Sequence, residues 1–219
     1  MISRARLLLL PLLAGEVFTP RVSPAQRAEV TGFGIVAGPR SIVLSEGVRE
    51  TVQGVWLGMV LEVRVDRFLV SGFGLRGTLA PVANTVRRDG GEEGILVRFE
   101  PRAGLGVDAM YTARAFSSAV GYQRWDMLSL GAWGSVVLGD PALRAFARGS
   151  YLPAVGVSGQ PSPSLALAAD VGVSVTPRRA PVVIRLTYRF ERFDFPAQPA
   201  SRFEAFERIA LEVGYRASR

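Results

Sequence analysis

Large apolar residues recur at every second position along most of this chain. The clearest example lies near the C-terminus, at Ile209, Leu211, Val213 and Tyr215, where the intervening residues are small or charged. A period of two places successive side chains on opposite faces of a strand. The pattern therefore predicts a strand with one apolar face.

The same alternation predicts about ten strands. We expect them at 30–38, 52–65, 68–79, 95–100, 104–115, 128–138, 143–155, 165–175, 182–191 and 209–215. Roughly eight to twelve strands fit a chain of this length, at ~10–15 residues for each strand and its turn. The pattern thus predicts an all-β protein, with one antiparallel up-and-down sheet closed into a barrel.

The predicted connections alternate in length. Compact turns are expected at 66–67, 101–102, 139–141 and 177–181, and longer or more polar connections at 38–50, 84–93, 117–121, 157–163 and 196–201. Consecutive connections of an up-and-down barrel lie at opposite rims. One rim is therefore expected to carry short turns and the other longer loops.

Composition excludes several classes of protein. Hydrophobic residues make up 48% of the 219 residues, yet no apolar run reaches the ~18 residues of a membrane helix. The chain has no His and no Cys, which excludes disulfides and imidazole chemistry. Its formal charge of +7 comes entirely from arginines, because lysine is absent, and these are spread along the chain. A nucleic-acid partner would require them to cluster, so none is expected.

The N-terminus resembles a secretory signal. Arg4 and Arg6 precede the apolar run 7–14, and a small-residue site follows at 23–25. We therefore expect a signal peptide at 1–25 and a barrel domain at 26–219.

Charged residues keep to one parity of the predicted strands, opposite the large apolar residues. Small residues and glycines share this polar face, which suits a crowded, hydrated lumen better than a water-exposed surface. An arginine exposed to lipid at the midplane would cost ~2–4 kcal/mol, so the apolar face is expected to contact lipid. The predicted lumen charge network comprises Glu62, Arg64, Arg76, Arg98, Glu100, Asp108, Arg114, Arg144, Arg148, Asp170, Arg185, Arg189, Glu191, Arg208 and Glu212.

With its export signal, alternating strands and terminal 209–215 pattern, the chain resembles the bacterial outer-membrane β-barrel proteins. The resemblance implies a location in the outer membrane and contact with its lipid, and we expect a monomer. It also implies that Ile209, Leu211, Val213 and Tyr215 form the signal read by the barrel-assembly machinery. The usual terminal aromatic residue is followed here by Arg216-Ala217-Ser218-Arg219.

The sequence predicts no catalytic residue, metal site or cofactor. Enzymes among such barrels use histidine: the omptin proteases with Asp, and the palmitoyl-transferase and phospholipase barrels with Ser. This chain has none. We expect a non-enzymatic structural barrel or a narrow, porin-like channel, with the lumen arginines either pairing as a plug or favouring anions. The alternative is a soluble periplasmic, lipocalin-like barrel that binds an apolar ligand.

Overall fold

The computed structural model describes residues 28–81, 87–118, 121–177, 180–196 and 202–218. The predicted signal peptide at 1–25 and residues 84–86 of a predicted loop lie outside the described residues. Among the described residues, no helix is long and apolar enough to cross a membrane.

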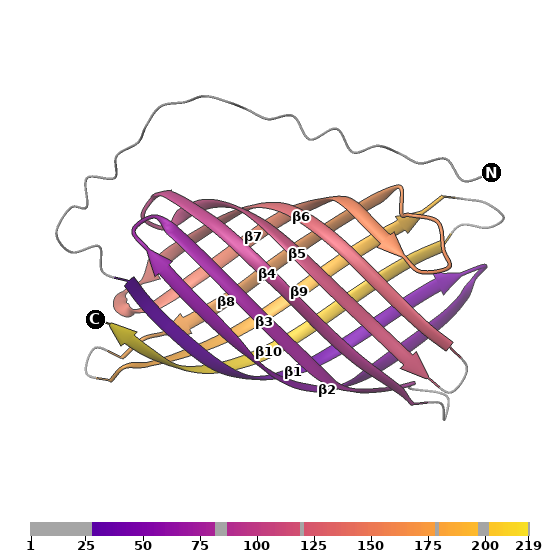
Figure 1. The fold of residues 1–219 in the computed structure, drawn as a ribbon, viewed down its shortest axis with the longest axis horizontal. Helices are drawn as coiled ribbons and strands as arrows, with labels where there is room; N and C mark the ends of the chain where they lie inside the picture. The colour runs from indigo at the N-terminus through magenta and orange to yellow at the C-terminus, as the bar shows by residue number, and fades with distance from the viewer. Residues whose placement is uncertain (1–27, 82–86, 119–120, 178–179, 197–201, 219) are drawn as a thin grey trace.

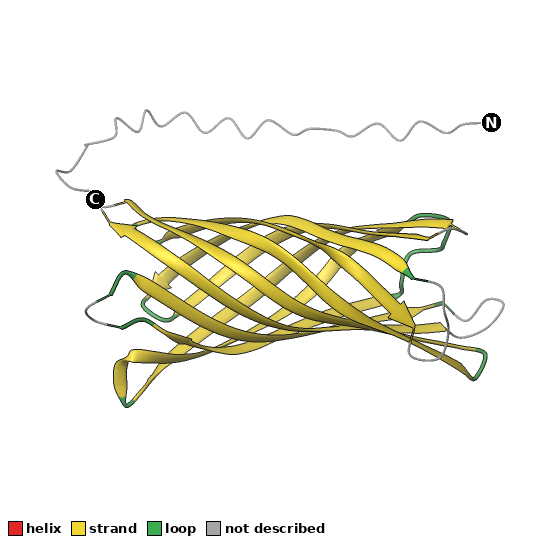
Figure 2. Ribbon diagram, turned by 90° about the horizontal axis from the view of Figure 1, so that it is seen from below, coloured by secondary structure: helices red, strands yellow, loops and turns green. Residues whose placement is uncertain are grey.

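Ten strands form one closed antiparallel sheet, in which each strand pairs with the next and β10 pairs with β1 (Figures 1 and 2). The strands are β1 (Ala28–Ser45), β2 (Val48–Val65), β3 (Phe68–Pro81), β4 (Arg88–Arg102), β5 (Leu105–Ser118), β6 (Gly121–Leu138), β7 (Asp140–Val157), β8 (Leu165–Val175), β9 (Val182–Phe195) and β10 (Arg202–Ser218). This arrangement confirms the predicted fold class and strand number.

The two ends of the barrel are distinguished by the chain termini. The first residue of β1 and the last residues of β10 meet at one end, here called the terminal rim, where Glu29 pairs with Ser218 (Figure 1). The other end is called the far rim. The turns after β2, β4, β6 and β8 lie at the terminal rim, and those after β1, β3, β5, β7 and β9 lie at the far rim.

Two polar segments that the sequence suggested to be loops belong to strands. β1 and β2 run on to a two-residue turn at Glu46 and Gly47, so the predicted loop at 38–50 is wrong. Both turn residues have positive φ, 52° and 79°, as a tight hairpin turn with the right twist requires. Likewise, residues 88–93 of the predicted loop at 84–93 form the start of β4. β2 and β4 thus continue although their outward positions carry Arg49 and Thr51, and Asp89 and Glu93, respectively.

An apolar belt surrounds the barrel on the side of the terminal rim. In β2, residues Val55, Leu57, Met59 and Leu61 are all more than half exposed. From Val55 to Val65, β2 spans about 25 Å along the barrel axis, at ~3.3 Å per residue and a tilt of ~40°. Equivalent belt residues are Val97, Val107, Leu130, Val171, Leu186 and Leu211. The belt has the height of a hydrocarbon layer, and a soluble barrel would have its polar face there.

Toward the far rim, the outward and inward positions exchange character. In β9, Leu186 and Tyr188 face outward and Glu191 is buried in the lumen. In the next two residues of the strand, Arg192 faces outward and Phe193 is buried in the lumen. β6 shows the same exchange, with Leu128 and Leu130 outside, then Asp126 and Arg124 outside beside the buried Met127 and Trp125.

The predicted orientation of β3 is wrong. The sequence suggested that Leu69, Leu75 and Leu79 face lipid and that Arg76 faces the lumen. Instead, all three leucines are buried inside and Arg76 is exposed on the outer face. Leu75 and Leu79 pack in the apolar cluster around Trp56, and Leu69 and Leu75 line the terminal side of the lumen. Large apolar residues therefore mark the inner face of β3 along most of its length.

A β-bulge between β6 and β7 causes a further difference. Leu128 pairs with Ala154 while Leu130 pairs with Tyr151, so β7 carries an additional residue in this interval. Such an insertion reverses the alternation beyond it. Tyr151 therefore faces outward as expected, whereas Val155, predicted on the same face, is buried in the lumen.

Candidate functional site

The lumen is the candidate site, since most of the buried charged residues of the described chain lie within it. From the terminal rim inward it contains an open cavity, then a layer of paired charges, then an apolar plug. A second, polar pocket opens at the far rim. Each layer is built from side chains of several strands.

Glu92 is at the centre of the deepest charged cluster. Its carboxylate accepts hydrogen bonds from Arg114 Nε at 2.8 Å and from Arg208 Nη1 at 2.6 Å. Arg114 also pairs with Glu191 at 2.5 Å, and Arg189 Nη2 approaches the other oxygen of Glu191 at 2.7 Å. Glu92, Arg114 and Glu191 are at most 2% exposed. Residues of β4, β5, β9 and β10 are thus joined across the lumen.

A second buried cluster lies nearer the terminal rim. Asp108 of β5 accepts a hydrogen bond from Arg98 Nε at 3.3 Å and one from Arg148 Nε at 2.8 Å. Arg148 also donates to Asp170 of β8 at 3.3 Å, and Arg189 lies 3.6 Å from that carboxylate. Arg189 therefore connects the two clusters, which together we call the charge layer.

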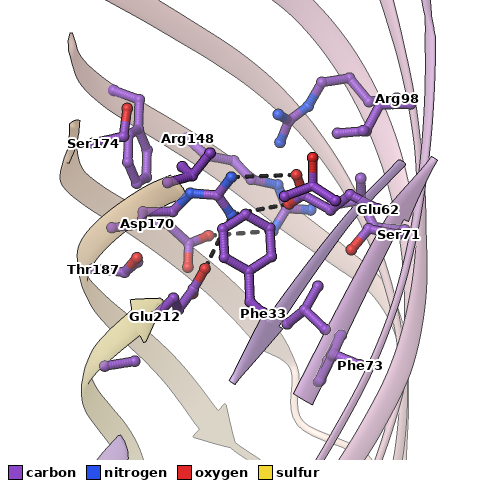
Figure 3. Close-up of a pocket in the computed structure, with 18 of the residues that line it drawn as sticks. Phe33, Glu62, Ser71, Phe73, Arg98, Arg148, Asp170, Ser174, Thr187 and Glu212 are labelled. Atoms are coloured by element: carbon purple, nitrogen blue, oxygen red, sulfur yellow. Dashed lines mark hydrogen bonds and ion pairs between the residues drawn. The ribbon is translucent and has the colours of Figure 1, made fainter. Parts of the chain in front are cut away.

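Three further ion pairs line the wall toward the terminal rim. Arg185 of β9 donates to Glu62 of β2 at 2.9 Å and to Glu212 of β10 at 3.0 Å. It therefore connects β9 with both β2 and β10. Figure 3 shows Glu62 and Glu212 pointing into the cavity around Phe33. Arg64 makes a bidentate pair with Glu100, at 2.8 and 3.0 Å.

An apolar plug fills the lumen on the far-rim side of the charge layer. Trp56 is fully buried, with ring centroids 5.8 Å from Phe206 and 6.3 Å from Phe116. A neighbouring group contains Trp125 and Phe193, whose ring centroids are 4.8 Å apart. Arg114 stacks on the Phe206 ring at 3.8 Å, so charge layer and plug are in direct contact. Trp125, expected at a rim, is part of this plug.

The terminal cavity has a volume of about 410 Å³. Its mouth is lined by Glu29, Arg64 and Arg216, which lie at the terminal rim, and its inner end by Arg189 and Arg208. The far-rim pocket is smaller, about 290 Å³, and its lining includes Glu50, Arg88, Arg202 and Glu204. The charge layer and the plug lie between the two.

The structure brings most of the predicted lumen charge network together. Thirteen of its fifteen members, all but Arg76 and Arg144, take part in the ion pairs just described: Glu62, Arg64, Arg98, Glu100, Asp108, Arg114, Arg148, Asp170, Arg185, Arg189, Glu191, Arg208 and Glu212. Arg144 lines the cavity and donates to Ser135 Oγ at 3.2 Å. Arg76 lies outside the lumen, on the outer face of β3.

Glu92 is the central residue that the sequence reasoning missed. The sequence predicts a polar loop at 84–93, because residues 87–93 are rich in Arg, Asp, Glu and Gly. The even position of Glu92 matches Arg98 and Glu100 on the same strand, so extending their alternation toward the N-terminus would have placed it in the lumen. The predicted assembly-signal residues Ile209, Leu211, Val213 and Tyr215 are all exposed on the outer face of β10.

Among the described residues, no group of three or more acidic side chains is arranged to hold a metal ion. The charge layer instead alternates carboxylates with guanidinium groups. Such pairing neutralises buried charge and braces opposite walls of the barrel.

The fold is that of the outer-membrane β-barrels. The outer-membrane protease OmpT from Escherichia coli is similar, with a TM-score of 0.52 and 10% identity, over 90% of this chain and 98% of the protease. The translocator domain of the autotransporter NalP from Neisseria meningitidis matches with 0.46 and 13%, over 85% and 88%. Neisserial surface protein A matches with 0.34 and 10%, over 85% and 96%. No protein-family model and no curated protein matches the sequence.

Proposed function

We propose that this protein is a non-enzymatic structural barrel of the outer membrane, with a lumen closed to ions. The observation that carries the proposal is the layer of buried side chains between the two pockets. Trp56 and Glu191 are 0% exposed, and Phe193 is 1% exposed. A barrel of this size has little bore once side chains fill it, and here they are also bonded to one another.

The outer belt supports the membrane location. Its apolar side chains would be exposed to water in a soluble barrel, while the paired charges would occupy the ligand cavity. This distribution is the reverse of what the lipocalin-like alternative requires. In an outer-membrane barrel with an even number of strands, the terminal rim faces the periplasm.

The non-enzymatic part of the proposal rests on chemistry. The similar protease shares the fold at 10% identity, which transfers no activity. The chain has no histidine and no cysteine to act as base or nucleophile. The buried carboxylates of the charge layer are each bonded to arginine, so they are poorly placed to accept a substrate proton.

The partners we propose are those of a small barrel: outer-membrane lipid, and the assembly machinery that reads β10. The outer face of β10, with Ile209, Leu211, Val213 and Tyr215, would present the signal before β10 pairs with β1. We propose a monomer, because the sheet of the described residues closes on itself through the pairing of β10 with β1.

Planar-bilayer recording tests the closed lumen. Purified protein refolded in lipid is expected to give no discrete conductance steps, and a general porin in the same bilayers is the positive control. The double variant Trp56→Ala with Phe206→Ala removes part of the plug and should increase the frequency of openings. Reproducible, ion-selective steps from the unaltered protein would overturn the structural role in favour of a channel.

A further inference from the structure

The terminal cavity is a blind pocket rather than one half of a pore. It opens between Glu29, Arg64 and Arg216 and ends at Arg189 and Arg208, which bond to the fully buried Glu191 and Glu92. Its volume of about 410 Å³ falls within the ~300–1,000 Å³ typical of small-molecule sites. A closed structural barrel has no need of such an opening.

Cationic side chains predominate in the lining. Eight arginines line the cavity, at positions 64, 98, 144, 148, 185, 189, 208 and 216, against four carboxylates, Glu29, Glu62, Asp170 and Glu212. Buried carboxylates behind the wall are shared, as when Asp108 serves both Arg98 and Arg148. Among the described residues, each of these arginines except Arg144 pairs with a carboxylate, so the excess positive charge of the lining lies at Arg144.

Within the described part of the chain, Arg144 is the lining arginine with no carboxylate partner. Among the described residues, its one hydrogen bond is from Nη1 to Ser135 Oγ, at 3.2 Å. Ser174 is its direct neighbour across the β7–β8 ladder and also lines the cavity. Thr187 lines it as well, and its buried hydroxyl has no hydrogen-bond partner in the structure. Figure 3 shows Ser174 and Thr187 on the same wall.

Flat apolar surfaces lie beside these donors. Arg98 stacks on the Trp133 ring at 4.4 Å, and Arg185 on the Phe33 ring at 4.5 Å. Phe73 and Phe146 complete the aromatic part of the lining. The guanidinium groups of Arg98 and Arg185 each lie beside a ring. This arrangement suits a ligand with both a charge and a planar apolar body.

We propose that the terminal cavity binds a small organic anion, an aromatic carboxylate or sulfonate, entering from the terminal rim. Arg144 and the hydroxyls of Ser135 and Ser174 donate hydrogen bonds to the anionic group. The rings of Trp133 and Phe146 contact the aromatic body. This binding role goes beyond the structural function, which requires no ligand.

Titration calorimetry in a zwitterionic detergent tests the proposal, with 2-naphthoate as the anionic probe and neutral 2-naphthamide as its isostere. The full-length barrel should bind 2-naphthoate at least ~10-fold more tightly than the amide, the difference expected for one charge-assisted hydrogen bond. Arg144→Gln should weaken the binding of 2-naphthoate by about the same factor and leave the affinity for the amide unchanged.

Arg88→Gln is the matched control, because Arg88 pairs with Glu50 in the pocket at the far rim. It makes the same change of charge on the other side of the plug and should leave binding within ~2-fold. Heat-modifiable gel mobility verifies that both variants form barrels. Equal affinity for acid and amide, or equal effects of the two variants, would overturn the proposal.

The two proposals fail separately. Conductance steps together with intact binding of 2-naphthoate would disprove the closed lumen and support the anion site. Absence of conductance together with equal binding of 2-naphthoate and the amide would support the structural barrel and disprove the anion site.

Discussion

The terminal and far halves of this barrel are built from the same strands but with opposite patterns. In the terminal half, apolar side chains face outward, and paired charges line the cavity and close its inner end. In the far half, Arg124 and Arg192 face outward while Trp125 and Phe193 fill the lumen. The terminal half therefore suits a barrel in lipid, and the far half suits a barrel in water. The change of pattern indicates where lipid ends.

The largest expected effect comes from breaking the charge layer of the terminal half. Glu191→Ala leaves Arg114 and Arg189 with an uncompensated buried charge, so we expect a loss of about 3–5 kcal/mol in the free energy of unfolding. Urea titration of the protein refolded in lipid vesicles measures it. The control is Glu50→Ala, which breaks an exposed pair with Arg88 and should cost less than ~1 kcal/mol. Similar costs for both variants would contradict a structural charge layer.

The next effect compares an inward with an outward leucine. Leu79 is fully buried in the plug, whereas Leu57 is 60% exposed on the outer belt. Leu79→Ala should cost roughly 3 kcal/mol, because it leaves a cavity among packed side chains. Leu57→Ala should cost less, about 1 kcal/mol, because lipid fills the vacated space. The same unfolding titration measures both, and a larger cost for Leu57→Ala would reverse the assigned faces of β2 and β3.

The smallest effect concerns Arg76, the residue whose face the sequence did not reveal. Because it lies outside, near the edge of the belt, Arg76→Leu should change the unfolding free energy by no more than ~1 kcal/mol. Arg148→Leu, which removes the partner of Asp108 and Asp170 in the charge layer, should cost several times as much. An equal loss in the two variants would mean that Arg76 contributes to the lumen after all.

Local signals in the sequence were sufficient to predict the barrel. Tight turns such as Asp66-Arg67 and long alternating stretches such as 52–65 fix strand number and most strand positions. The charges of the terminal half were also predictable, because Arg98, Glu100 and Asp108 share the parity opposite the belt. These features depend only on neighbours along one or two strands.

The far half was less predictable because its lining residues are apolar. Leu75 and Leu79 look like belt residues when β3 is read alone, and only Trp56 and Phe206 from other strands show that they line a plug. Glu92 was missed for a related reason: its neighbours 87–91 are those of a loop, and its arginine partners lie on β5 and β10. The bulge that turns Val155 inward leaves no clear mark in a single sequence.

The bridge from Arg185 to Glu62 and Glu212 has a consequence for the order of assembly. Glu62 belongs to β2, and Arg185 and Glu212 belong to β9 and β10, so 123 residues separate Arg185 from Glu62. Such distant partners meet only late, when the last strand is placed against the first. Until then these charges are unpaired, and a partly built sheet lacks their stabilisation. We therefore expect closure of the barrel to be cooperative, with incomplete barrels short-lived.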